Sequence, residues 1–400
     1  MQDPLDARVM NGELWQELCA TLAEAPELFR DETFPDPPED RAEYLRYLLQ
    51  FLASGISVCV AHGDPDHPEF TRMMDLDRRW GLDSPDHLYL FASIRGDAEY
   101  VISGDPGSAN LVDFQVNEGH YALGDVAANR TQGSLIRDEL DRATDGSIEL
   151  HLGGAPRERN WIAMRPGARF VQVRQVFADW ENEWAADLRI ERVGGAVMRP
   201  RLRTDQIAER VDLLRTWMRE GGTLWRNMSK AMLAMPPNTL VIPDPHKSSE
   251  FSGMKGQAYG MGNFYCQPDE AVVLEFEPPP CRHWSVSLAT WWWEAIDPAT
   301  RQSSLNHAQA ELAGDGAFQA VICHDDPGIA NWLDCAGHDR GTLIARFVGA
   351  ERSPVPSYSV VPRAELERAL GPDPARRLTP SERNARLSRR RRAMWSRFRR

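Results

Sequence analysis

The sequence lacks several features that would place the protein in a specialised class. It has no run of about 18 apolar residues, so we expect no transmembrane segment. The first residues, MQDPLDARVMNGELW, show no basic region followed by an apolar core, so we expect no signal peptide. The six cysteines are dispersed and form no C-x-x-C pair, which is typical of buried thiols in a reducing compartment. Together these absences predict a cytoplasmic protein.

A basic surface of the kind that binds phosphate is also missing from most of the chain. The formal net charge is -13, although Ser381–Arg400 contains nine arginines and a single glutamate. Because affinity for nucleic acid needs a basic footprint on the folded surface, we expect no nucleic-acid partner. We expect the arginine-rich tail to dock on the acidic body or on a partner subunit, which leaves a homo-oligomer as an open alternative. The tail has few apolar residues for its length and is predicted to be dispensable for folding.

What is present is a chain long enough for two domains with a large core. Its hydrophobic residues follow helical spacing over the first 80 residues and alternate as in short strands over two later regions. Helical spacing returns between those regions and at the end. The pattern predicts an α+β fold that is mainly β. We expect a helical N-terminal segment (1–80), a β-sandwich-like domain (81–200), a helical bridge (201–238), a second β-rich domain (239–362) and a basic helical tail (363–400).

Three local expectations follow from the same spacing. The segment Phe70–Trp80 is predicted to be the third helical piece of the N-terminal segment. The segments His87–Ile94 and Tyr100–Ile102 are predicted to form a hairpin around a glycine turn. A strand is predicted over His283–Trp293, and it ends in three consecutive tryptophans.

The segment Ala320–Val348 holds the densest group of polar and aromatic side chains. Two runs of alternating residues predict strands. These side chains lie in the connection between the two strands, which turns at Pro327-Gly328. Polar loops held on strands are where binding and catalysis concentrate. We therefore expect the functional site here, with the candidate residues His324, Asn331, Trp332, Asp334, His338 and Arg340.

Acid–base chemistry is the first interpretation of this segment. Asp334 lies four residues before His338 and is suited to orient its imidazole, so these two are the predicted catalytic residues. The alternative is that both only brace the loop. Cys335 is either a thiol activated by a nearby imidazole or a small buried filler, and we favour the filler.

Metal binding is a further alternative, because imidazole and carboxylate side chains suit zinc and non-haem iron. His307, His324 and His338 lie near several aspartates in the sequence. Their spacing matches no compact ligand motif such as HExxH. We therefore predict no metal ligands and leave the cofactor open.

Tryptophans suggest a ligand pocket. Trp291 and Trp293 would share one face of the expected strand, and Trp332 follows in the polar connection. Indoles supply large apolar contact area with a single N–H donor, which suits a flat, mostly hydrophobic ligand. Core packing is the alternative for at least one face of the strand. The predicted ligand contacts are Trp291, Trp293, His324, Asn331, Trp332 and Arg340.

Several different short polar motifs, or phrases, are distributed over Asp145–Pro362. They are Asn160-Trp161, Val173-Arg174-Gln175, Asp179-Trp180-Glu181, Pro245-His246-Lys247, Asp269-Glu270-Ala271, Glu275-Phe276-Glu277-Pro278-Pro279, Ser304-Leu305-Asn306, Asp326-Pro327-Gly328, Asn331-Trp332-Leu333-Asp334 and Gly337-His338. On these phrases the chain resembles the bacterial family known as domain of unknown function number twelve-fourteen. The resemblance implies a jelly-roll-like fold for residues 239–362, preceded by another β-rich domain. It supplies no established reaction or cofactor.

The leading functional hypothesis is an enzyme that acts by hydrolytic or acid–base chemistry on a small hydrophobic or aromatic molecule. A non-catalytic protein that binds such a molecule in the same pocket is the first alternative. A structural or assembly protein is the second. Arg174 lies among apolar residues and is expected to form a buried ion pair, with a clamp for an anionic substrate as its alternative.

Overall fold

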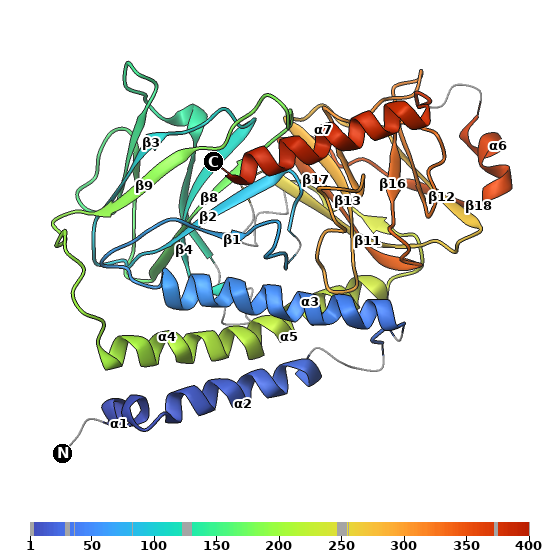
Figure 1. Cartoon of the computed structure of the whole chain (residues 1–400). Helices are drawn as coiled ribbons and strands as arrows, with labels where there is room; N and C mark the ends of the chain where they lie inside the picture. The colour runs from blue at the N-terminus through green and yellow to red at the C-terminus, as the bar shows by residue number, and fades with distance from the viewer. Residues whose placement is uncertain are drawn as a thin grey trace. The chain divides into compact units, whose positions relative to one another are not determined.

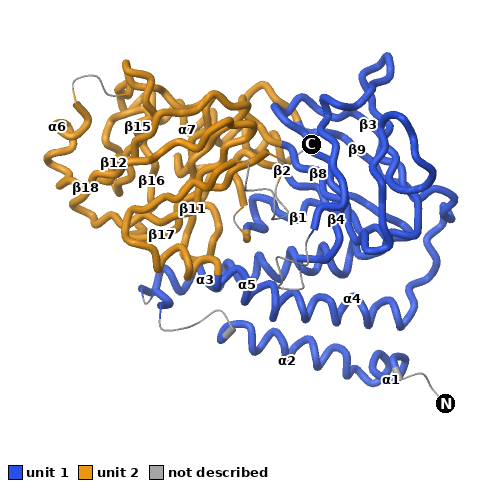
Figure 2. The backbone as a smooth tube through the Cα atoms, turned by 180° about the vertical axis from the view of Figure 1, so that it is seen from behind, with its two compact units in different colours: residues 1–79, 88–175, 185–227 blue, residues 80–87, 176–184, 228–400 orange. Residues whose placement is uncertain are grey.

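The computed structural model describes residues 4–28, 33–35, 37–81, 83–121, 130–245, 254, 256–371 and 375–399. The chain forms two compact units, and each unit takes segments from separate regions of the sequence (Figure 2). Unit 1 comprises residues 1–79, 88–175 and 185–227. Unit 2 comprises residues 80–87, 176–184 and 228–400.

Helices form the first and last parts of unit 1 (Figure 1). Phe51 and Trp217 join two of them: their rings stack with centroids 4.9 Å apart, and the indole donates to the Phe51 carbonyl oxygen at 3.1 Å. Two helices continue as π-helical turns, at Ile56–Ala61 and Trp217–Gly221. The helices are α1 (Pro4–Met10), α2 (Glu13–Leu28), α3 (Pro38–Gly55), α4 (Thr204–Thr216) and α5 (Gly222–Leu233), the last of which leads into unit 2.

Two sheets form the β part of unit 1. The five-stranded sheet has the order β1 (Thr71–Met74), β2 (His87–Ser93), β8 (Ala168–Val176), β4 (Leu111–Glu118) and β5 (Arg130–Ile136). The four-stranded sheet has the order β7 (Trp161–Ile162), β6 (Ile148–Leu152), β3 (Tyr100–Asp105) and β9 (Asp187–Arg192). β6 and β8 alternate apolar and polar residues, as expected when the two faces of a sheet differ.

A buried polar row lies on β4. Asp113, Gln115 and Asn117 alternate with apolar residues, and all three are buried. Arg174 of β8 donates to Gln115 Oε1 at 2.8 Å, and Gln115 Nε2 donates to Asp113 Oδ2 at 2.7 Å. Arg174 therefore reaches an acid through an amide, within unit 1. Burial raises the pKa of Asp113 to about 6, against the opposing effect of the Arg174 charge.

Unit 2 contains the other two sheets. The five-stranded sheet has the order β10 (Leu240–Val241), β11 (Gln257–Tyr265), β17 (Arg340–Val348), β13 (His283–Ala289) and β14 (Ser304–Asn306). The four-stranded sheet has the order β16 (Trp332–Asp334), β15 (Phe318–Cys323), β12 (Glu270–Phe276) and β18 (Ser357–Pro362). Among the described residues of unit 2, β15 and β16 pair in parallel, and the other strand pairs are antiparallel.

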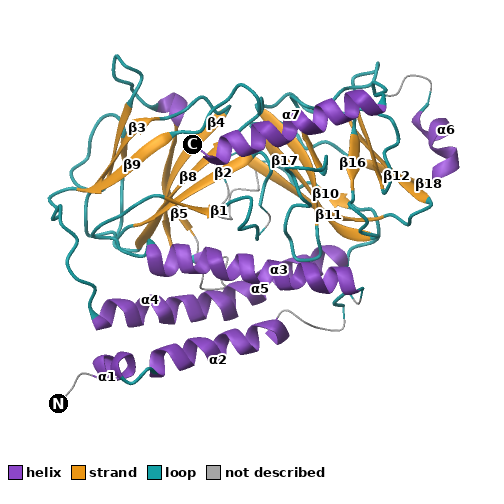
Figure 3. Cartoon of the chain, in the orientation of Figure 1, coloured by secondary structure: helices purple, strands orange, loops and turns teal. Residues whose placement is uncertain are grey.

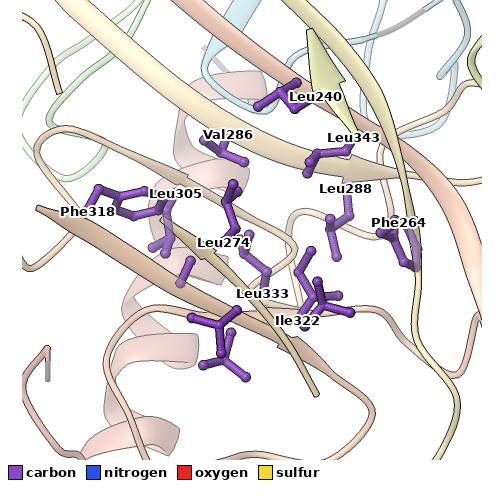
Figure 4. Packing of buried hydrophobic residues seen from close by; sticks show 14 of the residues in the cluster. Leu240, Phe264, Leu274, Val286, Leu288, Leu305, Phe318, Ile322, Leu333 and Leu343 are labelled. Carbon is purple, nitrogen blue, oxygen red and sulfur yellow. The ribbon is translucent and has the colours of Figure 1, made fainter. Parts of the chain in front are cut away.

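One hydrophobic core holds the two sheets of unit 2 together. Leu274 and Ile322 of the four-stranded sheet lie in the same buried cluster as Val286, Leu288 and Leu343 of the five-stranded sheet (Figure 4). Each side chain is fully buried, and burial of apolar surface stabilises the fold by about 25 cal/mol per Å². The two sheets therefore share one core, and the jelly-roll-like fold expected for residues 239–362 stays a prediction.

Unit 2 ends in two helices, α6 (Leu366–Leu370) and α7 (Pro380–Arg399). The α7 side chains Arg383, Arg390 and Arg397 are buried, with exposed fractions of 3%, 8% and 3%. The tail therefore docks on unit 2, as one of the sequence-based alternatives proposed. Its burial argues against the expectation that the tail is dispensable for folding, because removing it would uncover the surface that these side chains cover.

The predicted fold class, α+β and mainly β, is confirmed (Figure 3). The predicted helix over Phe70–Trp80 is wrong, because Thr71–Met74 forms β1 and pairs with β2. The Asp75 carboxylate then accepts a hydrogen bond from the Leu76 N–H at 2.7 Å and turns the chain. The spacing of Met73, Met74 and Leu76 suits either structure, and strand pairing decided between them.

The predicted hairpin over residues 87–102 is also wrong. β2 and β3 have the expected places in the sequence but belong to different sheets. The N–H of Ile94 bonds the carbonyl oxygen of Arg169, so the end of β2 stays with β8 instead of turning back onto β3. Pairing with a distant strand outweighed the local glycine turn.

One helical segment among the described residues, Pro38–Ala61, is long and apolar enough to cross a membrane by length and composition alone. Of its most apolar window, 44% is buried inside the protein. Core helices pass the same test, and Phe51 in this segment stacks on Trp217. We therefore treat Pro38–Ala61 as a packed helix of unit 1.

Candidate functional site

The predicted catalytic pair, Asp334 and His338, is not joined in the described part of the chain. The Asp334 carboxylate accepts a hydrogen bond from Arg301 at 2.9 Å and another from the Ala336 N–H at 2.8 Å. The His338 Nδ1–H donates to the Cys335 carbonyl oxygen at 2.8 Å. Asp334 therefore braces Arg301 and a turn, and a backbone carbonyl orients the imidazole.

Cys335 is fully buried, and burial raises the pKa of its thiol well above the usual range. A neutral buried thiol is a poor nucleophile. This supports the filler interpretation over the nucleophile.

The predicted polar ligand contacts have structural partners instead. Asn331 is fully buried, accepts a hydrogen bond from the Glu311 N–H at 2.9 Å, and donates to the carbonyl oxygens of Glu311 and Gln319 at 2.6 and 3.0 Å. His324 Nε2 donates to the Cys266 carbonyl oxygen at 2.9 Å. Arg340 is the exposed first residue of β17. Asn331 and His324 thus brace connections of unit 2.

The three tryptophans do not form the predicted wall. β13 ends at Ala289, and Thr290 and Glu294 close a turn in which Trp293 has φ +61°. Trp291 and Trp293 therefore do not share a strand face, and both are buried. Trp332 belongs to the core cluster, and its indole donates to the Cys323 carbonyl oxygen at 3.0 Å.

The histidines considered as metal ligands have separate neighbours. His307 packs edge-on against His283 with ring centroids 5.1 Å apart, whereas His324 and His338 each bond a different backbone carbonyl. Residues His246 and Lys247, which belong to one of the family phrases, lie outside the described residues.

Unit 2 contains a cavity of about 660 Å³ beside α7. Its lining comes from three stretches of the chain, at residues 178–182, 302–311 and 376–393, and all three belong to unit 2. Ala178, Leu305 and Ala393 are buried apolar parts of the lining, whereas Asp179 and Glu181 are exposed at the rim. None of the predicted site residues lines this cavity.

Carboxylates at the cavity pair with its outer arginines. Arg376 donates to Glu382 at 2.7 Å, and Arg389 lies 3.4 Å from Glu181. These side chains are substantially exposed, so each ion pair contributes little to stability. The pairs neutralise the outer arginines.

Two inner arginines have other partners. Arg390 is buried and donates to the carbonyl oxygens of Pro298 and Ser304 at 2.7 and 3.1 Å, and to the Ser304 hydroxyl at 2.5 Å. Arg386 donates to the carbonyl oxygens of Ala330 and Gln309. Burial lowers the pKa of Arg386 to about 10 and that of Arg390 to about 9, so both stay charged at neutral pH.

Trp180 is part of the cavity lining and lies close to two guanidinium groups. Arg390 lies 4.3 Å and Arg397 4.8 Å from the centroid of its ring, both within the range of cation–π attraction. The indole N–H donates to Asp86 Oδ1 at 2.8 Å. Asn306 Nδ2 donates to the same oxygen at 2.7 Å.

The sequence contained a signal for this site. Arg383, Arg390 and Arg397 are seven residues apart, and Arg386 is one turn beyond Arg383, so the four lie along one side of a helix. The total charge of the tail does not indicate this side of the helix, whereas the spacing of its arginines does. Nothing in the sequence near Trp180 indicates that α7 packs there.

Residues 92–178 and 264–352 match a family described as a protein of unknown function, DUF1214. The resemblance to this family is confirmed. The second DUF1214 region includes most of the predicted site residues and the cavity residues 302–311. The arginines of α7 lie beyond both DUF1214 regions, so the family match alone does not mark them.

The chain is also similar to solved structures. The crystal structure of an uncharacterised protein from Burkholderia cenocepacia matches with a TM-score of 0.84 and 28% identity, over 90% of this chain and 99% of that one. The VPA0106 protein from Vibrio parahaemolyticus matches with a TM-score of 0.45 and 12% identity, over 79% of this chain and 98% of that one. Among curated proteins, no relative matches the chain. The Burkholderia protein therefore shares the fold over nearly the whole chain.

Proposed function

We propose that unit 2 binds a small organic anion in the cavity beside α7. The observation that carries this proposal is the pair of inner guanidinium groups, whose hydrogen bonds within the described part of the chain go to carbonyl and hydroxyl oxygens. A ligand carboxylate can accept hydrogen bonds from such groups and offset their charge, which no backbone carbonyl does.

The ligand expected here has an apolar body as well as an anionic group. Leu305, Leu378, Ala385 and Ala393 contribute apolar atoms to the same lining. The cavity volume lies within the range of about 300–1,000 Å³ that is typical of small-molecule sites. An aromatic carboxylate of the size of benzoate satisfies both requirements and is the probe of choice.

The test is calorimetric titration of the full chain with benzoate, and with benzamide as the uncharged analogue. We expect benzoate to bind and benzamide to bind at least tenfold more weakly. Arg386→Gln removes one inner charge but keeps a donor for the nearby carbonyl oxygens, and it should weaken benzoate binding about tenfold, or about 1.4 kcal/mol.

The matched control is Arg392→Gln, which removes an exposed charge from the same helix and leaves the cavity lining unchanged. It should leave benzoate affinity within about twofold. Equal binding of benzoate and benzamide, or equal losses in the two variants, would contradict an anion site at Arg386.

An acid–base role for His338 is our second proposal. The observation that favours it is the hydrogen bond from Nδ1 to the Cys335 carbonyl oxygen, because a carbonyl can only accept. This hydrogen bond places the proton of the neutral ring on Nδ1 and so fixes its tautomer. His338→Gln should then retain the wild-type melting temperature but lose any turnover found by substrate screening, whereas a lower melting temperature with full turnover would show a bracing role.

A further inference from the structure

Asp86 is the buried carboxylate behind the cavity wall. It is 1% exposed and comes from the segment 80–87, which belongs to unit 2 although it lies far from the rest of that unit in the sequence. Its Oδ1 accepts hydrogen bonds from Trp180 and Asn306, and its Oδ2 lies 3.5 Å from His283 Nε2. The side chain therefore sits where four segments of unit 2 meet.

Asp86 carries its negative charge at neutral pH. Burial by itself would raise its pKa, but hydrogen bonds and charges from His283 and Asn306 outweigh burial and hold the pKa below its usual range. The same carboxylate is the largest electrostatic influence that stabilises the charged forms of Arg390 and Arg397. Arg390 lines the cavity, whereas neither Asp86 nor Arg397 does.

We infer that Asp86 is a positioning residue that sets the anion affinity of the cavity from behind its wall. Its carboxylate favours the charged form of Arg390, and it accepts a hydrogen bond from the Trp180 indole, whose ring centroid lies 4.3 Å from that guanidinium. The negative charge of Asp86 thereby lowers the positive electrostatic potential that Arg390 produces at the cavity. A ligand anion and Asp86 both interact electrostatically with Arg390, because charges in a poorly hydrated site act over several ångströms. The negative charge of Asp86 therefore weakens binding of the anion. The inference rests on the proposed function.

The variant Asp86→Asn tests this directly. The amide oxygen can still accept the hydrogen bonds of Trp180 and Asn306, and the amide nitrogen can donate to His283 Nε2 once that ring carries its proton on Nδ1. The variant removes the charge and keeps the size of the side chain. We expect benzoate affinity to rise at least about fivefold, with little change for benzamide. A purely structural role predicts the opposite, since disordering Trp180 and Arg390 would weaken binding.

Arg397→Gln shifts the charge balance the other way. It removes the positive charge of Arg397, which Asp86 stabilises as it does that of Arg390. The glutamine keeps a donor for the Pro85 carbonyl oxygen, and the cavity lining is unchanged. Benzoate should then bind at least about threefold more weakly. This variant decides the inference if Asp86→Asn does not fold.

Asp334→Asn is the matched control. It neutralises another buried carboxylate of unit 2, whose arginine partner Arg301 does not line the cavity, and it should leave benzoate affinity within about twofold. Benzoate binding to the wild type with unchanged or weaker binding to Asp86→Asn would overturn the inference and leave the proposed function standing. If neither protein binds benzoate, the proposed function falls, and the inference with it.

Discussion

Buried guanidinium groups on α7 meet three kinds of partner. Arg383 donates to both oxygens of Asp326, at 2.9 and 3.1 Å, whereas Arg390 and Arg397 donate to carbonyl oxygens and lie over aromatic rings. A guanidinium is planar and weakly hydrated, so it tolerates such surroundings better than an ammonium group does. The chain places arginine and not lysine at all three positions for this physical reason.

Asp113 provides a prediction on pH dependence at the scale of one residue. Its pKa rises from 3.8 to about 6 in the folded protein, so its contribution to stability is present below about pH 4 and is lost as the pH rises to about 6. Asp113→Asn should therefore be more stable than the wild type above pH 6, by up to about 3 kcal/mol, and nearly equal below pH 4.

The measurement is urea unfolding of both proteins between pH 4 and 7. His120 titrates in the same range with the opposite sign, because burial lowers its pKa to about 4 and its contribution is lost as the pH falls. Its effect cancels in the difference between variant and wild type. A difference that does not vary with pH would show that Asp113 keeps an ordinary pKa.

At the scale of elements, α7 covers unit 2 through side chains spaced seven residues apart. Arg383 lies over Trp332, Arg390 over Trp180 and Arg397 over Phe177, with distances to the ring centroids of 5.3, 4.3 and 4.1 Å. Ala393 and Met394 add buried apolar contacts on the same helix. The helix thus seals aromatic side chains that would otherwise be exposed to water.

Removal of α7 should strongly destabilise the protein. A chain that ends before Pro380 loses three buried guanidinium groups and their hydrogen bonds, and we expect it to lose at least about 3 kcal/mol of stability. Differential scanning calorimetry would show this as a lower melting temperature. The double variant Arg391→Gln/Arg392→Gln is the control, since both side chains are exposed and its melting temperature should not change. A truncated chain with the wild-type melting temperature would show that α7 is an appendage.

At the scale of the whole molecule, unit 2 is not a continuous stretch of the chain. Residues 80–87 and 176–184 contribute Asp86, Phe177 and Trp180 to it, and these residues contact α7 or β14. Each unit is therefore built from separate segments of the chain. The five domain ranges suggested by the sequence pattern stay predictions.

This organisation predicts that residues 228–400 do not fold stably alone. The fragment lacks Asp86, which leaves Arg390 and Arg397 buried without their internal counterion, and it lacks the aromatic rings that these arginines cover. Its amide spectrum by NMR should show poor dispersion, whereas the full chain should give a folded spectrum. A cooperative thermal transition of the fragment at the melting temperature of the full chain would contradict the prediction.

Local pattern determined the secondary structure of this protein more fully than it determined the site. Alternation over Phe170–Phe177 and Thr342–Val348 and helical spacing over Glu13–Phe29 correspond to β8, β17 and α2, because each element buries a face that its own residues define. Family phrases indicated the second β-rich domain. The density of polar side chains indicated a site at residues 324–340, where Asn331 and Asp334 form hydrogen bonds that brace the backbone and Arg301.

Only the tertiary structure decided where polar side chains meet. The sequence shows nine arginines in its last twenty residues, but not that Arg390 faces Trp180 or that Asp86 lies behind both. These contacts join residues separated by 94 and 210 positions, and no local spacing encodes them. Whether a charge is a solvated surface group or part of a buried network depends on what packs against it, and packing is settled only when distant segments come together.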